Sequence, residues 1–307
     1  MTMDLALVGI GKIARDQHIP ALSRSPDFRL AAVASRNAEL GGVASFRSLA
    51  ELLEARPDIP AVSLATPPQV RFDDARRAIL AGRHVMLEKP PGETLSEVED
   101  LARLARARGV TLFATWHSRH AAAVGPARDW LAGREIRAVD IAWLEDVRQW
   151  HPGQEWIWQP GGLGVFDPGI NALSVLTAIL PDSVHLAEAE LEFPENRATP
   201  IAARLVFAHP AGIPVAARFD WREAGPPRWQ IVIDTDQGRA VLDRGGAVLR
   251  LGSRVLAEGP DSEYPALYAR FAALIARGES EVDLSPMRHV ADAFLIGRHV
   301  ATARFDW

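Results

Sequence analysis

The sequence predicts a two-domain protein in which an α/β domain with a parallel sheet precedes an α+β domain with a mostly antiparallel sheet. Its 307 residues exceed the usual size of one domain. Up to about Trp116, short apolar runs alternate with helix-like segments, which is typical of parallel βαβ units. From Val184 to Leu251 apolar residues mostly alternate with polar ones, which is typical of antiparallel strands with one wet face. We therefore place the domains at residues 1–118 and 119–307.

In the first domain, two of the three predicted helices are bounded by recognisable start or stop signals. Thr94 and Glu97 form a capping-box pattern before an apolar periodic run, and Gly109 ends that run. Gly82 closes the preceding helix in the same way. The predicted helices span 12–24, 70–81 and 94–108, and the predicted strands span 5–9, 30–35, 61–65, 84–87 and 110–115.

The second domain begins with a predicted helix at 121–131 and a long strand at 136–147. Residues 148–166 are rich in Gly, Pro and Trp, which indicates an ordered loop, and a helix is predicted at 168–180. Predicted strands fill 184–251, and helices at 264–276 and 286–303 close the chain.

The composition excludes several classes of protein. The absence of cysteine rules out disulfide frameworks, thiolate metal sites and a cysteine nucleophile. A net charge of -5 argues against a nucleic-acid partner. No stretch approaches the ~20 apolar residues that a membrane span needs, and the first apolar run lacks the basic region of a signal peptide. We expect a cytoplasmic protein with no membrane partner.

A glycine-rich turn follows the first predicted strand. Gly9-Ile10-Gly11-Lys12-Ile13-Ala14 fits the G-x-G-x-x-A form of the dinucleotide fingerprint. Gly9 permits the tight turn, and Gly11 lets the backbone approach a pyrophosphate at the helix N-terminus. The alternative is a purely structural glycine turn, but the position at the start of a βαβ unit favours dinucleotide binding.

The end of the second predicted strand bears on the type of dinucleotide. An NAD-selective site carries Asp or Glu there, whereas this strand ends in Ser35-Arg36. A hydroxyl and a guanidinium suit a 2′-phosphate. We therefore expect NADP to be preferred, with NAD as a second cofactor. The alternative is that Arg36 is an ordinary exposed loop residue.

A lysine follows the predicted strand at 84–87. Glu88-Lys89-Pro90-Pro91 lies at the carboxyl end of that strand, where open parallel sheets bind their ligands. The two prolines restrict the backbone and so orient Lys89. Taken alone, Lys89 would be read as a surface residue before a turn.

These motifs together resemble the Gfo/Idh/MocA oxidoreductases. The resemblance rests on the glycine loop, Thr66-Pro67-Pro68, Glu88-Lys89-Pro90, and Gly161-Gly162 followed by Asp167 and Asn171, and it covers both domains. Residues 144–174 and the run Ala114-Thr115-Trp116-His117 are most similar to the bacterial members that oxidise L-arabinose and D-galactose at C1.

The resemblance implies a Rossmann domain, an α+β domain with a large open-faced, mostly antiparallel sheet, and an active site between them. It implies that Lys89 is catalytic and that a D-x-x-x-H motif lies on a helix of the second domain. Here that motif is Asp167 to Asn171, and the departure matters because an amide cannot shuttle a proton. The acid/base role then falls to Asp167, to Lys89 or to both. Asp167 could also simply cap the helix before Pro168.

The predicted cofactor contacts come from the strand ends of the first domain. They are Gly9, Gly11, Lys12, Ile13, Ser35, Arg36, Thr66, Pro67, Glu88 and Lys89.

Six of the nine tryptophans fall between residues 116 and 158, and four of them lie within 143–158. An indole offers an apolar face and one N–H donor, which suits a sugar ring, although each of these rings could equally pack the loop against the sheet. The predicted sugar-binding residues are Asn171, His117, Glu145, His151 and Trp150. The spacing of His117, His120, His151 and Asp167 is too loose for a metal site, and we expect none.

The sequence therefore predicts NAD(P)-dependent oxidation of an aldopyranose, L-arabinose or D-galactose, at C1 to the aldonolactone. The alternatives are a dehydrogenase of the same family that acts at another ring carbon, such as an inositol dehydrogenase, and a non-catalytic NADP-binding regulator. A homodimer through the second-domain sheet is a further expectation.

Overall fold

A computed structural model describes residues 2–306 and divides them into two compact units. The first unit contains the residues up to His117 together with Tyr264–Asp283, and the second contains Ser118–Glu263 and the residues from Leu284 onward. The first break therefore lies one residue before the predicted domain boundary. Residues 264–283, however, join the first unit, whereas sequence reasoning places them in the second domain.

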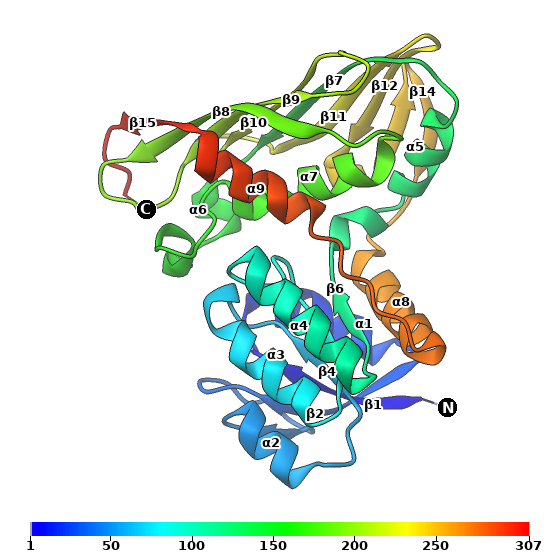
Figure 1. Ribbon diagram of the computed structural model, residues 1–307, viewed down its shortest axis with the longest axis vertical. Helices are drawn as coiled ribbons and strands as arrows, with labels where there is room; N and C mark the ends of the chain where they lie inside the picture. The colour runs from blue at the N-terminus through cyan, green and yellow to red at the C-terminus, as the bar shows by residue number, and fades with distance from the viewer. Residues whose placement is uncertain (1, 307) are drawn as a thin grey trace. The chain divides into compact units, whose positions relative to one another are not determined.

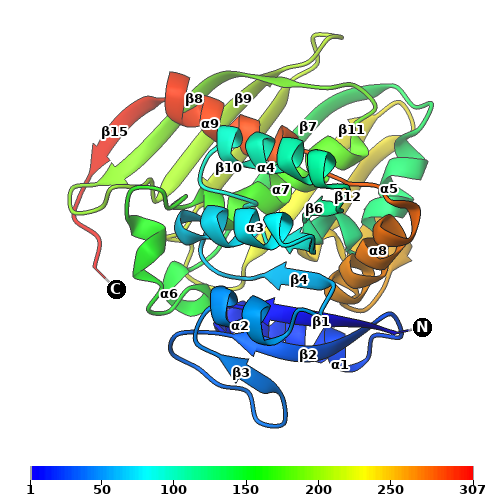
Figure 2. The same cartoon turned by 60° about the horizontal axis from the view of Figure 1, so that its bottom comes forward.

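The first unit is built on a six-stranded parallel sheet with the order β3-β2-β1-β4-β5-β6. Figure 2 shows this order in β3, β2, β1 and β4. The order reverses between β1 and β4, and in doubly wound sheets ligands bind at the carboxyl ends of the strands beside such a reversal. The strands are β1 Met3–Val8, β2 Phe28–Ala34, β3 Ala44–Phe46, β4 Ala61–Leu64, β5 His84–Leu87 and β6 Leu112–Ala114.

Helices cover both faces of this sheet (Figure 1). Helix α8 (Glu263–Arg277) buries Tyr268 and Phe271 against Leu5, Phe28 and Phe113 of the sheet, which is why this segment belongs to the first unit. The other helices are α1 Ile19–Ser23, α2 Leu49–Ala55, α3 Arg71–Leu80 and α4 Leu95–Arg108.

The predicted capping box of α4 is present. The Thr94 side chain accepts the Glu97 N–H, the Glu97 carboxylate accepts the Thr94 N–H, and Gly109 ends the helix in the left-handed region.

A π-helical turn interrupts the first helix of the chain. The helix runs from Lys12 to Ser23, close to the predicted 12–24, but Ala14–His18 (η1) forms a π turn. Such turns often occur at functional sites. This one ends on His18, whose side chain is buried in the first unit.

The second unit contains a nine-stranded mixed sheet with the order β14-β13-β12-β11-β7-β10-β9-β8-β15. The pairs β7–β10 and β8–β15 are parallel and the other neighbours are antiparallel. The strands are β7 Ile136–Leu144, β8 His185–Pro194, β9 Ala202–Ala208, β10 Val215–Asp220, β11 Arg228–Thr235, β12 Gly238–Asp243, β13 Val248–Leu251, β14 Arg254–Glu258 and β15 Arg298–Thr302.

Two helices, α7 (Phe166–Ile179) and α9 (Ser285–Ile296), run along one face of this sheet (Figure 1). Within residues 2–306 no helix covers the opposite face, so the predicted open-faced sheet is confirmed. None of the described helices has the length and apolar character that crossing a bilayer requires.

The chain end corrects one prediction. The helix expected at 286–303 ends at Ile296, and residues from Arg298 form β15 against β8. The backbone of Gly297 is extended, and a Cβ there would collide with the Ala293 carbonyl oxygen and crowd Leu191. The close approach of β8 therefore ends the helix, which periodicity along the sequence does not reveal.

Candidate functional site

The glycine loop of the first unit leaves room at the N-terminus of the first helix. Gly9 has a φ of +89°, and a Cβ there would lie 2.9 Å from the Thr66 nitrogen, so the turn needs glycine. A Cβ on Gly11 would meet no heavy atom within 4 Å. The Thr66 Oγ1 is buried and has no hydrogen-bond partner among the described residues. Open space, a helix N-terminus and an unsatisfied hydroxyl together fit a bound pyrophosphate.

The remaining predicted cofactor residues of this loop lie around that space. Lys12 pairs with Asp16 on the surface, while Ile13 packs against the core under α8. Pro67 is exposed in the turn that follows β4. Whether these residues touch a cofactor stays a prediction.

Ser35 and Arg36 lie at the carboxyl end of β2, as expected. Ser35 is half-buried and its backbone N–H donates to the Phe46 carbonyl, whereas Arg36 is exposed. Among residues 2–306 no carboxylate forms an ion pair with Arg36. Its guanidinium is therefore available to an anionic group.

Lys89 is half-buried directly after β5, and the Lys89–Pro90 peptide bond is cis. The buried Arg71 holds this turn in place. The Arg71 guanidinium donates to the backbone carbonyls of Glu88 and Pro90, and also to the carbonyl of Thr66 after β4. One side chain thus joins the turns after two neighbouring strands and positions Lys89.

Glu88, the neighbour of Lys89, lies in a buried polar cluster. Its Oε1 accepts a hydrogen bond from the Tyr264 hydroxyl and lies 3.5 Å from His18 Nε2, and its Oε2 accepts the Lys89 N–H. His18 Nδ1 in turn lies 2.7 Å from the Tyr268 hydroxyl. The cluster therefore ties β5 to the first helix and to α8.

The neighbouring side chains of this cluster lower the pKa of Glu88. Burial alone raises the pKa of Glu88, but the nearby imidazoles of His18 and His117 and the hydrogen bond from Tyr264 outweigh it. The pKa of Glu88 is therefore well below its usual range. Because the carboxylate is engaged by protein groups, a contact between Glu88 and a cofactor stays a prediction.

His117 is the predicted sugar-binding residue that the structure assigns to the first unit. Its ring stacks on Tyr264, with centroids 5.5 Å apart and planes inclined by 22°. The predicted sugar-binding residues therefore fall into two groups, with His117 in the first unit and the others in the second.

In the second unit, the helix α7 carries Asp167 and Asn171 four residues apart, which places them on one face of the helix. Asp167 is buried in the first turn, where the helix dipole favours a carboxylate. The capping position is Val165, so the alternative that Asp167 is the N-cap is wrong. Among the described residues none forms a hydrogen bond with the Asn171 amide, which leaves it available to a ligand.

A line of contacts connects Asp167 to Glu145 and Trp229. His151 Nδ1 lies 3.5 Å from Asp167 Oδ2, and His151 Nε2 lies 3.1 Å from Glu145 Oε1. The indole N–H of Trp229 donates to Glu145 Oε2 at 2.7 Å. Three predicted residues, Asp167, Glu145 and His151, are thus brought together in one unit.

Aromatic rings flank this line. The Trp150 ring meets Trp229 edge to face at 4.8 Å, and Trp143 stacks on Trp229 at 6.3 Å. Trp150 is 36% exposed, so it is the ring of this group that faces solvent. Trp158 is buried, in keeping with the packing alternative for that ring.

Sequence reasoning missed several residues of both units: His18, Arg71, Trp221, Trp229, Tyr264 and Tyr268. The Trp221 ring is buried 5.3 Å from the His151 ring, and its indole N–H has no hydrogen-bond partner within the described residues. No motif marks these positions. The excess of tryptophan was the one signal available, and it was followed only as far as residue 158.

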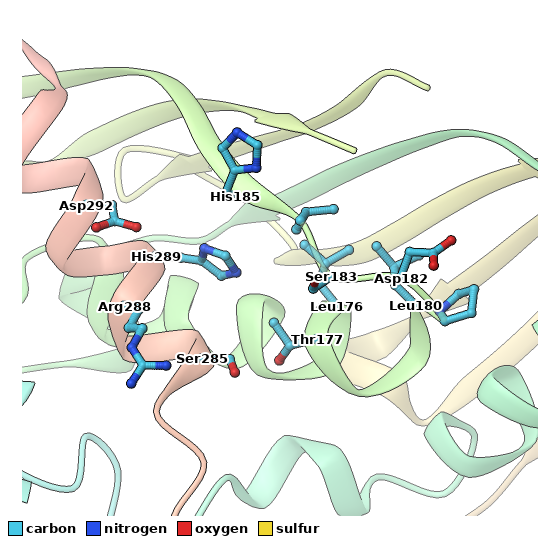
Figure 3. Close-up of a pocket in the computed structure, with 12 residues that line it drawn as sticks. Leu176, Thr177, Leu180, Asp182, Ser183, His185, Ser285, Arg288, His289 and Asp292 are labelled. Carbon is cyan, nitrogen blue, oxygen red and sulfur yellow. The ribbon is translucent and has the colours of Figure 1, made fainter. Parts of the chain in front are cut away.

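A separate cavity of about 400 Å³ lies at the other end of α7. Figure 3 shows His289 and Arg288 of α9, His185 of β8, and Thr177 of α7 around it. Asp167 and Thr177 are ten positions apart on this helix, which corresponds to ~15 Å at ~1.5 Å per residue. This cavity is therefore distinct from the face that carries Asp167.

No group of three or more His, Asp or Glu side chains in residues 2–306 is placed to hold a metal ion.

Comparisons with known proteins identify the family. Residues 3–115 match the model of the GFO_IDH_MocA oxidoreductase family, NAD-binding Rossmann fold. The chain is 44% identical to a galactose 1-dehydrogenase of Pseudomonas fluorescens, with 98% of each chain covered. The crystal structure of a D-galactose-1-dehydrogenase protein from Rhizobium etli is 52% identical and superposes with a TM-score of 0.96 over 99% of this chain and 98% of that one.

A more distant structure shares the fold alone. A 3-ketoreductase from Actinomadura kijaniata, solved with NADP, is 21% identical and has a TM-score of 0.84 over 98% of this chain and all of that one. Full-length identity above 40% to a curated relative, together with the match in the first unit, establishes the conclusion. The chain belongs to the Gfo/Idh/MocA family of oxidoreductases and has the family's NAD-binding Rossmann fold.

Proposed function

We propose that this enzyme oxidises an aldopyranose at C1 to the aldonolactone, with D-galactose and L-arabinose as substrates. The observation that carries the proposal is the arrangement on α7, where a buried carboxylate (Asp167) and an available amide (Asn171) share one face of the helix, and His151 contacts that carboxylate. Full-length similarity to two galactose 1-dehydrogenases supports the choice of substrate.

Lys89 and Asp167 are the acid/base groups for the proton of the C1 hydroxyl. When bound, the nicotinamide cofactor supplies the acceptor for the hydride that leaves C1. A group that exchanges a proton with the anomeric oxygen lies within roughly 2.6–3.2 Å of it in the productive complex, and Lys89 and Asp167 are the two candidates for that role. Arg71 limits the motion of the Lys89 turn, so the lysine is oriented before the substrate arrives.

The sugar hydroxyls are held by polar side chains. Asn171, His117, Glu145 and His151 bind hydroxyls, and Trp150 packs on the apolar face of the ring. D-galactose and L-arabinose pyranoses share their ring hydroxyl arrangement and differ by one CH₂OH group. A pocket that tolerates this group discriminates by only about 1–3 kcal/mol, so both sugars are turned over.

NADP is the preferred cofactor and NAD is the weaker one. The support is the exposed, unpaired Arg36 beside Ser35 at the end of β2. A hydrogen bond to a charged group contributes about 1.5–3 kcal/mol, so Arg36→Ala lowers kcat/KM with NADP roughly 10- to 100-fold and leaves the NAD value nearly unchanged. Equal losses with both cofactors would contradict this assignment.

A substrate panel tests the proposed reaction. Purified enzyme is mixed with a set of aldoses and inositols and with NADP or NAD, and the absorbance of the reduced cofactor is followed. A lactone that hydrolyses to an acid supports oxidation at C1, whereas a ketone product indicates another ring carbon. Binding of NADP without any turnover would instead indicate a regulatory protein.

Variants then test the two proposed catalytic groups. Lys89→Ala and Asp167→Ala each lower kcat by at least ~10²-fold, because general acid/base groups contribute about 10²–10⁴-fold. NADP binding, measured by fluorescence titration, persists in both. Turnover near the wild-type value in both variants would refute the assignment.

Two wider expectations accompany this function. A homodimer through the uncovered sheet face remains a prediction, and sedimentation of the purified protein would check it. A cytoplasmic location remains a prediction as well.

A further inference from the structure

His151 connects two buried carboxyl groups in the second unit. Its Nε2 lies 3.1 Å from Glu145 Oε1 and its Nδ1 lies 3.5 Å from Asp167 Oδ2. The side chains of Glu145 and Asp167 are 3% and 5% exposed, whereas that of His151 is 14% exposed. The imidazole is therefore the member of the three that has access to solvent.

The partners of Glu145 determine which nitrogen of His151 carries a proton. An indole N–H can only donate, so Glu145 Oε2 is the acceptor of the Trp229 bond, and as a carboxylate Glu145 offers His151 only an acceptor at Oε1. Glu145 Oε1 then accepts from His151 Nε2–H, which leaves a lone pair on Nδ1 facing Asp167 in the neutral imidazole. Glu145 and Trp229 thus hold the tautomer.

In this tautomer neither Nδ1 nor the Asp167 carboxylate carries a proton, so the two cannot form a hydrogen bond. At 3.5 Å it exceeds the usual N–O hydrogen-bond range of about 2.7–3.2 Å, as expected when a lone pair faces a carboxylate. A proton that reaches Asp167 would convert this contact into a hydrogen bond. Catalytic contacts that are long in the ligand-free protein commonly shorten in the reacting complex.

We propose that His151 relays the substrate proton from Asp167 to solvent, with Glu145 and Trp229 as positioning residues that hold its tautomer. The proposal rests on the proposed C1 oxidation. The O–H bond of the C1 hydroxyl breaks as Asp167 takes the proton, and the C1–H bond breaks as hydride leaves to the cofactor. The Asp167 O–H bond then breaks as Nδ1–H forms, and the Nδ1–H bond of the imidazolium breaks in turn as water takes that proton, which restores the Nε2–H tautomer.

This relay accounts for Asn171 at the position four residues after Asp167. The Asn171 amide can bind a hydroxyl but cannot carry a proton. The imidazole that lies against Asp167 comes instead from the loop after β7. On this face of the helix, Asn171 then binds the sugar and Asp167 transfers the proton.

Two substitutions separate the relay from a merely structural role. His151→Gln keeps hydrogen-bonding capacity but cannot be protonated, and Glu145→Gln lets the amide donate to Nε2 and so reverses the tautomer. Both lower kcat roughly 10²-fold at neutral pH, and the loss shrinks as pH rises because hydroxide can accept the proton. The matched control is His209→Gln, a buried histidine of the same unit 3.9 Å from Asp182, which leaves kcat unchanged.

Chemical rescue and NMR complete the test. Added imidazole restores kcat in His151→Ala in proportion to its concentration, whereas it does nothing for His209→Gln. In ¹⁵N-histidine spectra of the ligand-free wild type, neutral His151 is protonated at Nε2, and in Glu145→Gln it is protonated at Nδ1.

The outcomes distinguish the two proposals. If the wild type oxidises no aldose at C1, the proposed function fails and the relay with it. If the wild type is active but His151→Gln raises only KM, or imidazole rescues nothing, the relay alone is overturned. A wild-type tautomer protonated at Nδ1 would also overturn it, whatever the activity.

Discussion

Replacing Glu88 by Gln should destabilise the first unit, because it removes the charge of a buried cluster while keeping its shape. The Gln oxygen can still accept from the Tyr264 hydroxyl, but the carboxylate that faces His18 at 3.5 Å is lost. Breaking a buried pair by removing one charge costs about 3–5 kcal/mol. At roughly 2–4 °C per kcal/mol for a domain of this size, the melting temperature should fall by roughly 6–20 °C.

The direction in which pH changes the stability follows from the pKa of Glu88. The folded-state pKa of Glu88 lies below its unfolded value, which is about 4.3 for a free Glu side chain. The unfolded state therefore binds more protons in that range, and the stabilisation is fully present above about pH 4.3. It is lost as pH falls through the folded-state pKa. Glu88→Gln should show a flatter fall in stability on acidification than the wild type.

Calorimetry of the ligand-free protein at pH 7 measures the loss of stability, and the same measurement from pH 5 down to about pH 2 measures the pH effect. The control is Asp100→Asn, which removes an exposed pair with Arg103 in the same unit and should change stability by only about 0.2–1 kcal/mol. The reasoning would be refuted if Glu88→Gln unfolded within about 0.5 kcal/mol of the wild type at pH 7 with an unchanged pH profile.

Two further predictions concern packing and protonation. Gly169→Ala should destabilise the second unit by about 1–3 kcal/mol and lower kcat, since the new Cβ would lie 2.7 Å from the Phe219 ring and displace the first turn of α7. Gly125→Ala, whose Cβ meets nothing within 4 Å inside a helix, should be neutral or stabilising when both variants are unfolded by denaturant titration, and the reverse order of stability would contradict the packing argument. Burial lowers the pKa of His84, whose Nδ1 accepts the Thr111 N–H, so its contribution to stability is full above about pH 6.5 and is lost as pH falls. His84→Gln should therefore reduce the difference between unfolding free energies at pH 7 and pH 5, and an undiminished difference would show that other groups cause it.

Local signals in the sequence were sufficient for much of the first unit. The glycine loop, the capping box at Thr94 and the turn at Lys89 each depend on residues a few positions apart, and the structure has each of them. The same kind of signal was available but unused for α2, where the Ser48 side chain accepts the Glu51 N–H.

The parts of the site that were missed depend on contacts between distant residues. The hydroxyl that binds Glu88 is 176 residues away in Tyr264, and the indole that holds Glu145 is 84 residues away in Trp229. Arg71 binds three carbonyl groups that no side-chain pattern encodes. Such partners are selected by the folded arrangement of strands and helices, so periodicity and spacing along one sequence cannot identify them.

The return of α8 to the first unit determines how this protein can be divided. Phe271 and Tyr268 cover Leu5 and Phe28, so a polypeptide ending near residue 118 would expose the apolar surface that they bury. The cofactor-binding half is therefore not a contiguous stretch of the gene, and it cannot be exchanged with another protein by a single crossover. Recombination that preserves folding would have to carry both segments, with the whole of 118–263 exchanged or kept as an insertion between them.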